Sequence, residues 1–336
     1  MSANLTILTV VIQKHYSYVQ RQLDLAARLN PDTPFKLIVV DNASLSDSGL
    51  VLDDARCRVL PGVARDENLS TDYRGSYHHA TALNSAIKEV DTRFLLILDP
   101  DLFPVYNNWI GECIEHMQKR DLSVFGVPWY YRWYRKYRYF PCVHFMMLDL
   151  DKIDRSRLDF SPALKQDHER EDSSLHNLFH RLSPGLYARF LIGTRRDTGW
   201  RMYDRFAGRR GSRHGLALPV IDVAKEIVKP KHLASAAGQR RERMAPRRWS
   251  FLPAPGEYLE PGQAPGFEHR AFRLLEPEKF VWRGAPFAFH LRGNVRDVMN
   301  GEFGRDIEAN VLEDLFRRVS EAPAWTDWSR TEAAVH

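Results

Sequence analysis

The chain has 336 residues, a hydrophobic fraction of 44%, a net charge of +5 and a pI near 9.0. This length allows one large domain or two modest ones with a substantial core. The mild positive charge suits anionic substrates or a membrane surface, but by itself it does not indicate nucleic-acid binding.

Cysteine content and hydropathy narrow the class of protein further. The three cysteines, Cys57, Cys113 and Cys142, include no Cys-x-x-Cys pair, so the sequence supports neither a disulfide framework nor a structural zinc site. No apolar stretch approaches about 18 residues, and the N-terminus lacks the features of a signal peptide. The expected location is therefore cytoplasmic.

Residues 1–150 alternate between strand-like and helix-like segments, which predicts a largely parallel sheet. Strands are expected at residues 5–12, 35–40, 94–98, 123–127 and 143–150. Helices are expected at residues 17–30 and 75–90 and around Cys113.

Residues 151–300 are less regular and are interpreted as a region appended to the same sheet. The expected features are a helix near residues 175–182, a basic loop at 229–255 and renewed order at 280–291. Residues 301–336 are expected to form a C-terminal helical extension. The spacing of its apolar residues predicts an amphipathic helix with Ile307, Val311, Leu315 and Val319 on one face.

The apolar segment at residues 94–98 ends in Asp99-Pro100-Asp101. Ligands of open α/β sheets bind outside the carboxyl ends of the strands, so both carboxylates are expected at a ligand site. Mg²⁺ and Mn²⁺ commonly use one or two protein carboxylates together with substrate phosphates. The spacing therefore points to a metal–diphosphate site, although Asp-Pro-Asp alone is also an ordinary turn sequence.

Four separated motifs occur in one order, at residues 37–44, 68–84, 96–101 and 290–294. Together they resemble a family-two glycosyltransferase of the GT-A fold, well over residues 5–150 and more thinly up to residue 295. The resemblance implies an α/β fold with a Rossmann-like mixed sheet flanked by helices, followed by an irregular acceptor-side region and a C-terminal helix. It also implies a nucleotide-sugar donor, Mn²⁺ or Mg²⁺ on the donor diphosphate, and inverting transfer to an acceptor hydroxyl.

The resemblance assigns roles to individual residues. Asp41 would hold the nucleobase edge, Asp99 would reach the ribose or the metal, and Asp101 would coordinate the metal. His290 occupies the family's late histidine position beside the diphosphate and is the third expected metal ligand. The other donor-binding candidates are Asn42, Asn68 and Asn84. Two alternatives stay open, namely a simple turn after the strand for residues 41–44 and a core histidine for His290.

The transfer reaction also needs a general base to take the proton of the acceptor hydroxyl. The family position is an Asp in a Glu-Asp pair. Asp197 is the first candidate because it lies in a glycine-containing, aromatic-flanked segment, where Trp200 is expected to stack on a sugar. Asp172 is the alternative, because Glu171-Asp172 is the literal pair.

Residues 129–140 contain eight aromatic and four cationic side chains in twelve positions. Aromatic faces stack on sugars, and arginine pairs with phosphate or carboxylate. This composition predicts an acceptor platform that includes Trp129, Tyr131 and Arg132, with an edge hairpin or a homodimer contact as the alternative. No nucleic acid is expected as a partner.

The sequence therefore predicts a metal-dependent, inverting glycosyltransferase of surface polysaccharide or lipopolysaccharide biosynthesis. Residues 1–150 would bind the nucleotide sugar, and residues 151–300 would supply the acceptor side and the base. The acceptor would be a glycan or a lipid-linked glycan, with peripheral contact at the inner face of the membrane. The alternative is a non-catalytic glycan- or polyanion-binding protein on the same fold.

Overall fold

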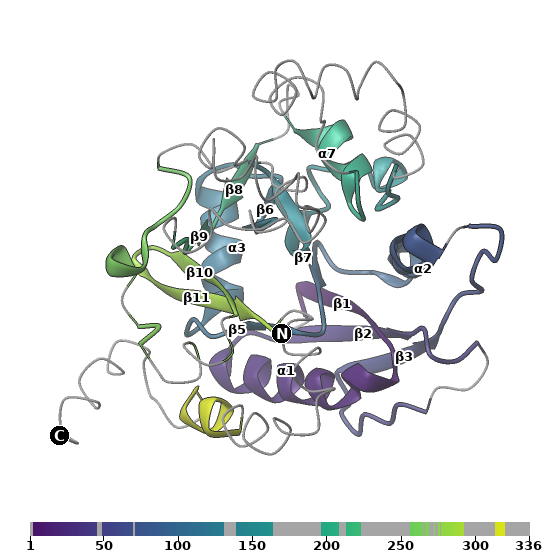
Figure 1. Ribbon diagram of the computed structural model, residues 1–336, viewed down its shortest axis with the longest axis horizontal. Coiled ribbons are helices and arrows are strands. Elements are labelled where there is room, and N and C mark those ends of the chain that lie inside the picture. The colour runs from purple at the N-terminus through teal and green to yellow at the C-terminus, as the bar shows by residue number, and fades with distance from the viewer. Residues whose placement is uncertain are drawn as a thin grey trace, which may run out of the picture.

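The computed structural model (Figure 1) describes residues 3–45, 49–69, 71–130, 139–163, 196–207, 213–222, 256–264, 266–268, 272, 275, 277–291 and 313–319. Within these residues the strands form a seven-stranded sheet in the order β3-β2-β1-β4-β7-β6-β8 and a four-stranded sheet in the order β5-β11-β10-β9. Helices flank the larger sheet, so the predicted mixed α/β fold class is confirmed.

One half of the larger sheet is parallel, as predicted. Its elements are β1 (Leu5–Val11), α1 (Tyr16–Leu29), β2 (Phe35–Asp41), β3 (Cys57–Pro61), α2 (Thr71–Ala86) and β4 (Phe94–Leu98). β1 pairs in parallel with β2 on one side and with β4 on the other. Every residue of β1 and β4 is buried, which explains why β4 is wholly apolar and β1 is apolar apart from Thr6 and Thr9.

The order of these strands creates a switch point between β1 and β4. The chain runs from β1 outward through β2 to β3 and then returns past β1 to form β4. Right-handed crossovers that run in opposite directions place α1 and α2 on opposite faces of the sheet, which Figure 1 shows. Ligands of open α/β sheets bind at such a switch point, beyond the carboxyl ends of the strands.

The other half of the sheet contains antiparallel pairs, which agrees with the mixed sheet that the family resemblance implies. Its elements are α3 (Trp109–Lys119), β6 (Val124–Pro128), β7 (Pro141–Asp149), α7 (Trp200–Phe206) and β8 (His214–Leu216). β7 is antiparallel to both β4 and β6, whereas β8 is parallel to β6. The chain crosses from β4 to β6 and leaves one position between them, which β7 fills in the opposite direction.

The smaller sheet brings the late part of the chain to the end of β4. It consists of β5 (Leu102–Pro104), β9 (Leu218–Pro219), β10 (Glu278–Trp282) and β11 (Ala285–His290), and all its pairs are antiparallel. In this register His290 lies opposite Leu102 on one side and opposite Glu278 on the other. The short 3₁₀ helices are η1 (Gln13–His15), η2 (Ile87–Glu89), η3 (Arg155–Arg157) and η7 (Pro261–Gln263).

Residues 313–319 are helical and pack on the smaller sheet near α1. Leu315 and Val319 are buried, as the predicted amphipathic face requires, and the Phe316 ring contacts Phe103. The expected helix near 175–182 and loop at 229–255, together with Ile307 and Val311, lie outside the described residues. The three cysteines are free thiols. Among the helices that the structure describes, none is long and apolar enough to cross a membrane.

Gly126 in β6 provides a test of how β6 and β7 are packed. A Cβ atom at this position would lie 2.0 Å from the carbonyl oxygen of Phe145, so the strand pairing itself would have to shift. We expect Gly126→Ala to lower the free energy of unfolding by about 1–3 kcal/mol, measured by urea denaturation. In α2, a Cβ on Gly75 meets nothing within 4 Å. The matched control Gly75→Ala should raise stability by about 0.5–1 kcal/mol, and equal losses in both variants would contradict this account.

Candidate active site

The loop formed by residues 99–101, here named the DPD loop, follows β4 directly at the switch point. The side-chain amide of Gln22 in α1 donates hydrogen bonds to the carbonyl oxygens of Asp99 (2.7 Å) and Leu102 (2.6 Å). The backbone N–H of Asp99 donates to the carbonyl of His144 in β7 (3.0 Å). The loop backbone is therefore held from both α1 and β7.

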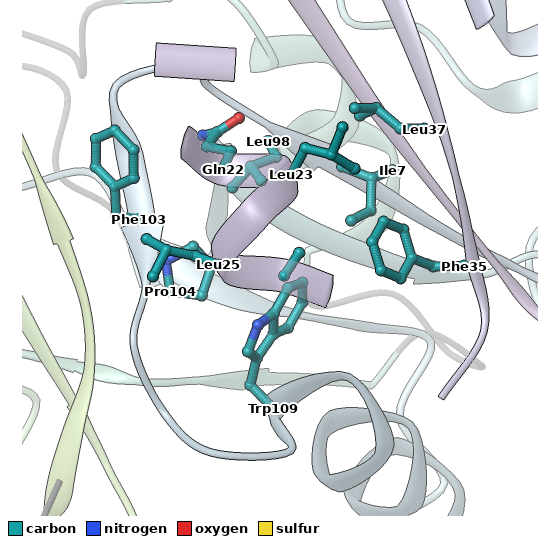
Figure 2. Close-up of a pocket in the computed structure, with 11 residues that line it drawn as sticks. Ile7, Gln22, Leu23, Leu25, Phe35, Leu37, Leu98, Phe103, Pro104 and Trp109 are labelled. Atoms are coloured by element: carbon teal, nitrogen blue, oxygen red, sulfur yellow. The ribbon is translucent and has the colours of Figure 1, made fainter. Parts of the chain in front are cut away.

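Figure 2 shows the apolar pocket that α1 forms against the sheet next to this loop. Its lining residues are Ile7, Gln22, Leu23, Leu25, Ala26, Phe35, Leu37, Leu98, Phe103, Pro104 and Trp109. None of these eleven side chains is titratable, so the pocket is packing space between α1 and the sheet and not a site for acid–base chemistry. Gln22 borders it and supplies the amide that fixes the DPD loop.

Gln22→Leu should lower the free energy of unfolding by about 1–3 kcal/mol, because it leaves two carbonyl oxygens without the amide that they accept from. The midpoint of urea denaturation would measure this loss. Gln20, two residues earlier on the exposed face of α1, provides the matched control. Gln20→Leu should change stability by less than about 0.5 kcal/mol, and similar effects of the two substitutions would show that the loop is not held by Gln22.

The smaller sheet places a histidine between two buried carboxylates. His290 Nε2 lies 2.9 Å from Asp101 Oδ1, and His290 Nδ1 lies 3.1 Å from Glu278 Oε2. His290 and Glu278 are each 2% exposed and Asp101 is 6% exposed. The strand register explains this arrangement, because Glu278 faces His290 across β10 and β11. Buried charges are costly unless they are paired. The position of His290 between Asp101 and Glu278 therefore serves to compensate negative charge.

The second carboxylate of the DPD loop is also surrounded by imidazole rings. His144 Nε2 lies 3.5 Å from Asp99 Oδ2, and His79 Nε2 in α2 lies 3.8 Å from Asp99 Oδ1. The centroid of the His144 ring is 4.4 Å from that of His290 and 4.2 Å from that of Trp129. These contacts join the two carboxylates of the DPD loop into one carboxylate–imidazole cluster, which consists of Asp99, Asp101, His144, Glu278 and His290.

The donor atoms of this cluster fit a divalent cation. One ligand atom each from Asp99, His144 and His290 lie within 4.8 Å of one another. The separations of 2.9 Å (His290 to Asp101) and 3.5 Å (His144 to Asp99) are close to the spacing of about 3 Å between neighbouring ligands of an octahedral ion with bonds of about 2.1 Å. The residues expected to bind the metal from the sequence, Asp99, Asp101 and His290, are therefore close together, and His144 joins them.

Asp41 ends β2 on the same edge of the sheet and is fully buried. Its carboxylate accepts hydrogen bonds from the hydroxyl of Tyr16 (2.6 Å) and from the backbone N–H of Ala43 (3.1 Å). Burial, this hydrogen bond and the charge of Asp41 raise the pKa of Tyr16 to about 12. Asp41 is thus a negative charge with two fixed donors at the position where the sequence predicts nucleobase binding.

Asp197 lies in a tight turn before α7 and is 4% exposed. Its Oδ1 accepts a hydrogen bond from the N–H of Thr198 (2.8 Å), and the Thr198 hydroxyl donates to the carbonyl of Ser76 in α2 (3.2 Å). Gly199 has a φ of +80°, and a Cβ there would lie 2.7 Å from Val143 Cγ1 in β7. Only glycine fits this turn, which packs against the same two elements, α2 and β7, that flank the DPD loop.

The model of glycosyl transferase family 2 matches residues 6–171. Over this segment, which is just under half of the chain, the protein is similar to glycosyl transferase family 2. The match includes the DPD loop and His144, and it confirms the resemblance inferred from the sequence motifs. Asp197, Glu278 and His290 lie beyond the matched segment.

Three solved structures are similar to parts of this chain. S. aureus TarS 1-349 in complex with UDP-GlcNAc is 19% identical, with 37% of this chain and 34% of that chain covered and a TM-score of 0.28. The mannosyltransferase PcManGT from Pyrobaculum calidifontis in complex with GDP-Man and Mn²⁺ is 13% identical, with 46% and 47% covered and a TM-score of 0.32. The galactosyltransferase LgtC in complex with donor and acceptor sugar analogs is 11% identical, with 78% and 89% covered and a TM-score of 0.38.

The chain spans 34% and 47% of the length of the first two of these structures. No curated protein sequence matches it significantly.

The remaining donor candidates lie in different environments. Asn42 follows Asp41 and contacts two backbone groups, because its amide donates to the carbonyl of His78 (3.4 Å) and accepts from the N–H of Val63 (3.2 Å). Burial lowers the pKa of His78. Asn68 is exposed, in a turn with Asp66.

Asn84 in α2 is hydrogen-bonded to residues 159–161. Its amide donates to Asp159 Oδ1 and to Ser161 Oγ (both 3.3 Å) and accepts from the N–H of Phe160 (2.9 Å). The structure therefore brings Asn42 next to Asp41, whereas Asn68 and Asn84 have other contacts.

The acceptor candidates are only partly described. The Trp200 ring is half-buried, 5.1 Å from the Arg196 guanidinium and 5.2 Å from the Tyr203 ring. Trp129 is 5% exposed and packs on the carboxylate–imidazole cluster through His144. The alternative base Asp172 and the platform residues Tyr131 and Arg132 lie outside the described residues.

Sequence reasoning missed three residues of the site. His144 interrupts the apolar sequence of β7, so a lone polar residue in a buried strand was the available signal for it. Glu278 begins β10 next to Lys279, and this charged pair at the start of a strand gave no such signal. Gln22 lies on the buried face of α1, where an amide is unusual between leucine and alanine neighbours.

Proposed function

We propose that this chain transfers a sugar, with inversion, from a nucleotide-sugar donor to a hydroxyl group of a glycan or glycolipid. The observation that carries the proposal is the carboxylate–imidazole cluster at the switch point, where two acidic side chains follow β4 directly. A buried group of this kind suits a charged ligand with a bound cation, and its position agrees with where α/β sheets bind nucleotides.

On the donor side, Asp99, Asp101 and His290 would hold Mn²⁺ or Mg²⁺. A divalent cation bound there neutralises charge on the departing nucleoside diphosphate. Asp41 would accept a hydrogen bond from the nucleobase at the end of β2, with Tyr16 and Ala43 fixing the direction of its carboxylate. The DPD loop would keep its orientation through the hydrogen bonds that the side-chain amide of Gln22 donates to the carbonyl oxygens of Asp99 and Leu102.

On the acceptor side, Asp197 would take the proton of the attacking hydroxyl while the bond between the anomeric carbon and the diphosphate oxygen breaks. The leaving nucleoside diphosphate keeps the electron pair of that bond. Trp200 would stack on the acceptor sugar. The position of the Asp197 turn against α2 and β7 supports this role, because the same elements contribute His79 and His144 beside the DPD loop.

The composition of residues 129–140 supports an acceptor that is lipid-linked or anionic, as in surface polysaccharide or lipopolysaccharide synthesis. Aromatic rings and arginine side chains together suit sugar faces and phosphate or carboxylate groups.

The decisive test is a calorimetric titration of the purified chain with UDP, GDP, dTDP, CMP and their common sugar conjugates. Each titration is done with Mn²⁺ and repeated with a chelator. We expect one nucleotide family to bind with Mn²⁺ and to lose binding in chelator, which would identify the donor class. If none of these nucleotides or nucleotide sugars binds, the proposal is overturned and a glycan- or polyanion-binding protein is favoured.

A further inference from the structure

His144 is the one member of the carboxylate–imidazole cluster in β7, and the family resemblance assigns it no role. It interrupts the otherwise apolar middle of the strand and is buried at 4% exposure. Its ring contacts the rings of Trp129 and His290, at centroid distances of 4.2 Å and 4.4 Å. A histidine that only filled the core would be surrounded by apolar groups, whereas this one faces the carboxylate of Asp99.

The distance between His144 and Asp99 indicates what the two side chains share. Their atoms Nε2 and Oδ2 are 3.5 Å apart, which is longer than the usual 2.7–3.2 Å of an N–H···O hydrogen bond. It is, however, a reasonable spacing for two neighbouring ligands of one cation. A ligand atom of His290 lies within 4.8 Å of both side chains, so three elements converge on one point.

We propose that His144 is a ligand of the donor-site cation, and that Asp99, His144 and His290 make this site selective for Mn²⁺, Co²⁺ or Zn²⁺ over Mg²⁺. The proposal rests on the donor site described under Proposed function and adds its metal preference. Imidazole nitrogen suits the transition metals, whereas Mg²⁺ prefers carboxylate, carbonyl and water oxygens. Two nitrogen ligands beside one or two carboxylates therefore disfavour Mg²⁺.

The neighbours of His144 and His290 fix the orientation of both rings before any nucleotide binds. Glu278 Oε2 accepts from Nδ1 of His290 at 3.1 Å, which directs Nε2 toward the DPD loop. Carboxylate partners of this kind fix the tautomer and ring orientation of metal-binding histidines. Trp129 packs edge-on against the His144 ring and limits its rotation. The site should consequently bind a transition metal without the donor.

The test uses the full-length chain, stripped of metal by a chelator and then titrated with CoCl₂ or MnCl₂ alone. Cobalt binding is followed by visible absorption, and nitrogen ligation of bound Mn²⁺ is followed by its ¹⁴N couplings in pulsed paramagnetic resonance. We expect one bound ion per chain with couplings from two imidazoles. A hundredfold excess of MgCl₂ should fail to displace it.

The variants are His144→Gln and Asp99→Asn, with His116→Gln as the matched control. His116 is half-buried in α3 against Phe125 and Trp282, at ring distances of 5.4 Å and 5.3 Å. We expect His144→Gln to weaken cobalt binding by about tenfold or more and to remove one ¹⁴N coupling, and Asp99→Asn to weaken binding similarly. His116→Gln should bind as the parent does. Urea denaturation verifies that each variant is folded. If His144→Gln is unfolded, Asp99→Asn still tests the same metal site.

Three results would overturn the inference. Unchanged cobalt affinity and unchanged ¹⁴N couplings in His144→Gln would make His144 a packing residue, and equal affinities for Mg²⁺ and Co²⁺ would refute the selectivity. A parent chain that binds nucleotide sugar but no metal alone would also refute it while leaving the proposed function intact. A parent chain that binds neither metal nor any nucleotide sugar would refute both proposals.

Discussion

Asp101→Asn is expected to abolish metal-dependent donor binding and to lower turnover by about two to three orders of magnitude. Asparagine has the shape of the aspartate and can still bond to His290 Nε2, which lies 2.9 Å from the carboxylate. It lacks the negative charge that holds a divalent cation, so the loss should be electrostatic and not a loss of fold. Calorimetry with Mn²⁺ and the nucleotide measures the first effect, and initial rates measure the second.

Asp121→Asn serves as the control for removing a carboxylate elsewhere. Asp121 has a side chain that is 68% exposed and pairs with Lys152 at 2.7 Å, away from the DPD loop. Its substitution should leave both donor binding and turnover within about twofold, since exposed ion pairs contribute little. Normal turnover by Asp101→Asn, with a folded protein, would show that the metal site has been assigned to the wrong carboxylate.

The parallel half of the sheet and the DPD loop could be predicted because their information is local. β1, β2 and β4 are almost entirely buried, and such strands appear in the sequence as predominantly apolar segments. α1 was recognised from the helical spacing of Val19, Leu23 and Ala26, all buried in the structure. α2 begins at Thr71, about one turn before the predicted start.

Elements defined by distant pairing could not be predicted in this way. β5 and β9 have three and two residues, too few to show any periodicity. β3 is only half-buried at the edge of the sheet, so its sequence lacks the apolar pattern of its neighbours. Each of these strands exists because a partner far along the chain pairs with it.

The same limit applies to the candidate site. The proximity of Asp101 to His290 spans 189 positions and depends on the pairing of β5 with β11. His144 reaches Asp99 only because β7 runs antiparallel to β4 in one particular register. The order of the motifs, through the family resemblance, predicted that Asp101 and His290 lie close together. Nothing in the sequence specified the register of β7 against β4 that brings His144 to Asp99.

Asp197→Asn is expected to lower kcat by about two orders of magnitude or more while donor affinity stays close to that of the parent. The amide keeps the hydrogen bond that Oδ1 accepts from Thr198 N–H, so the turn before α7 should persist. What it cannot do is take the proton of the acceptor hydroxyl. The measurement is a pair of values for each variant, namely kcat with saturating acceptor and the dissociation constant of the donor by calorimetry.

Thr198→Val is the matched control for this turn. It removes the hydroxyl that donates to Ser76 O but retains the backbone N–H that supports Asp197. Thr198→Val should lower the free energy of unfolding by about 1 kcal/mol, and kcat should stay within a few-fold of the parent value. If Asp197→Asn instead turned over at the full rate, proton removal would have to be assigned to another carboxylate. Asp172, in the literal Glu-Asp pair, is the candidate that the sequence offers, and the same pair of measurements on Asp172→Asn would decide it.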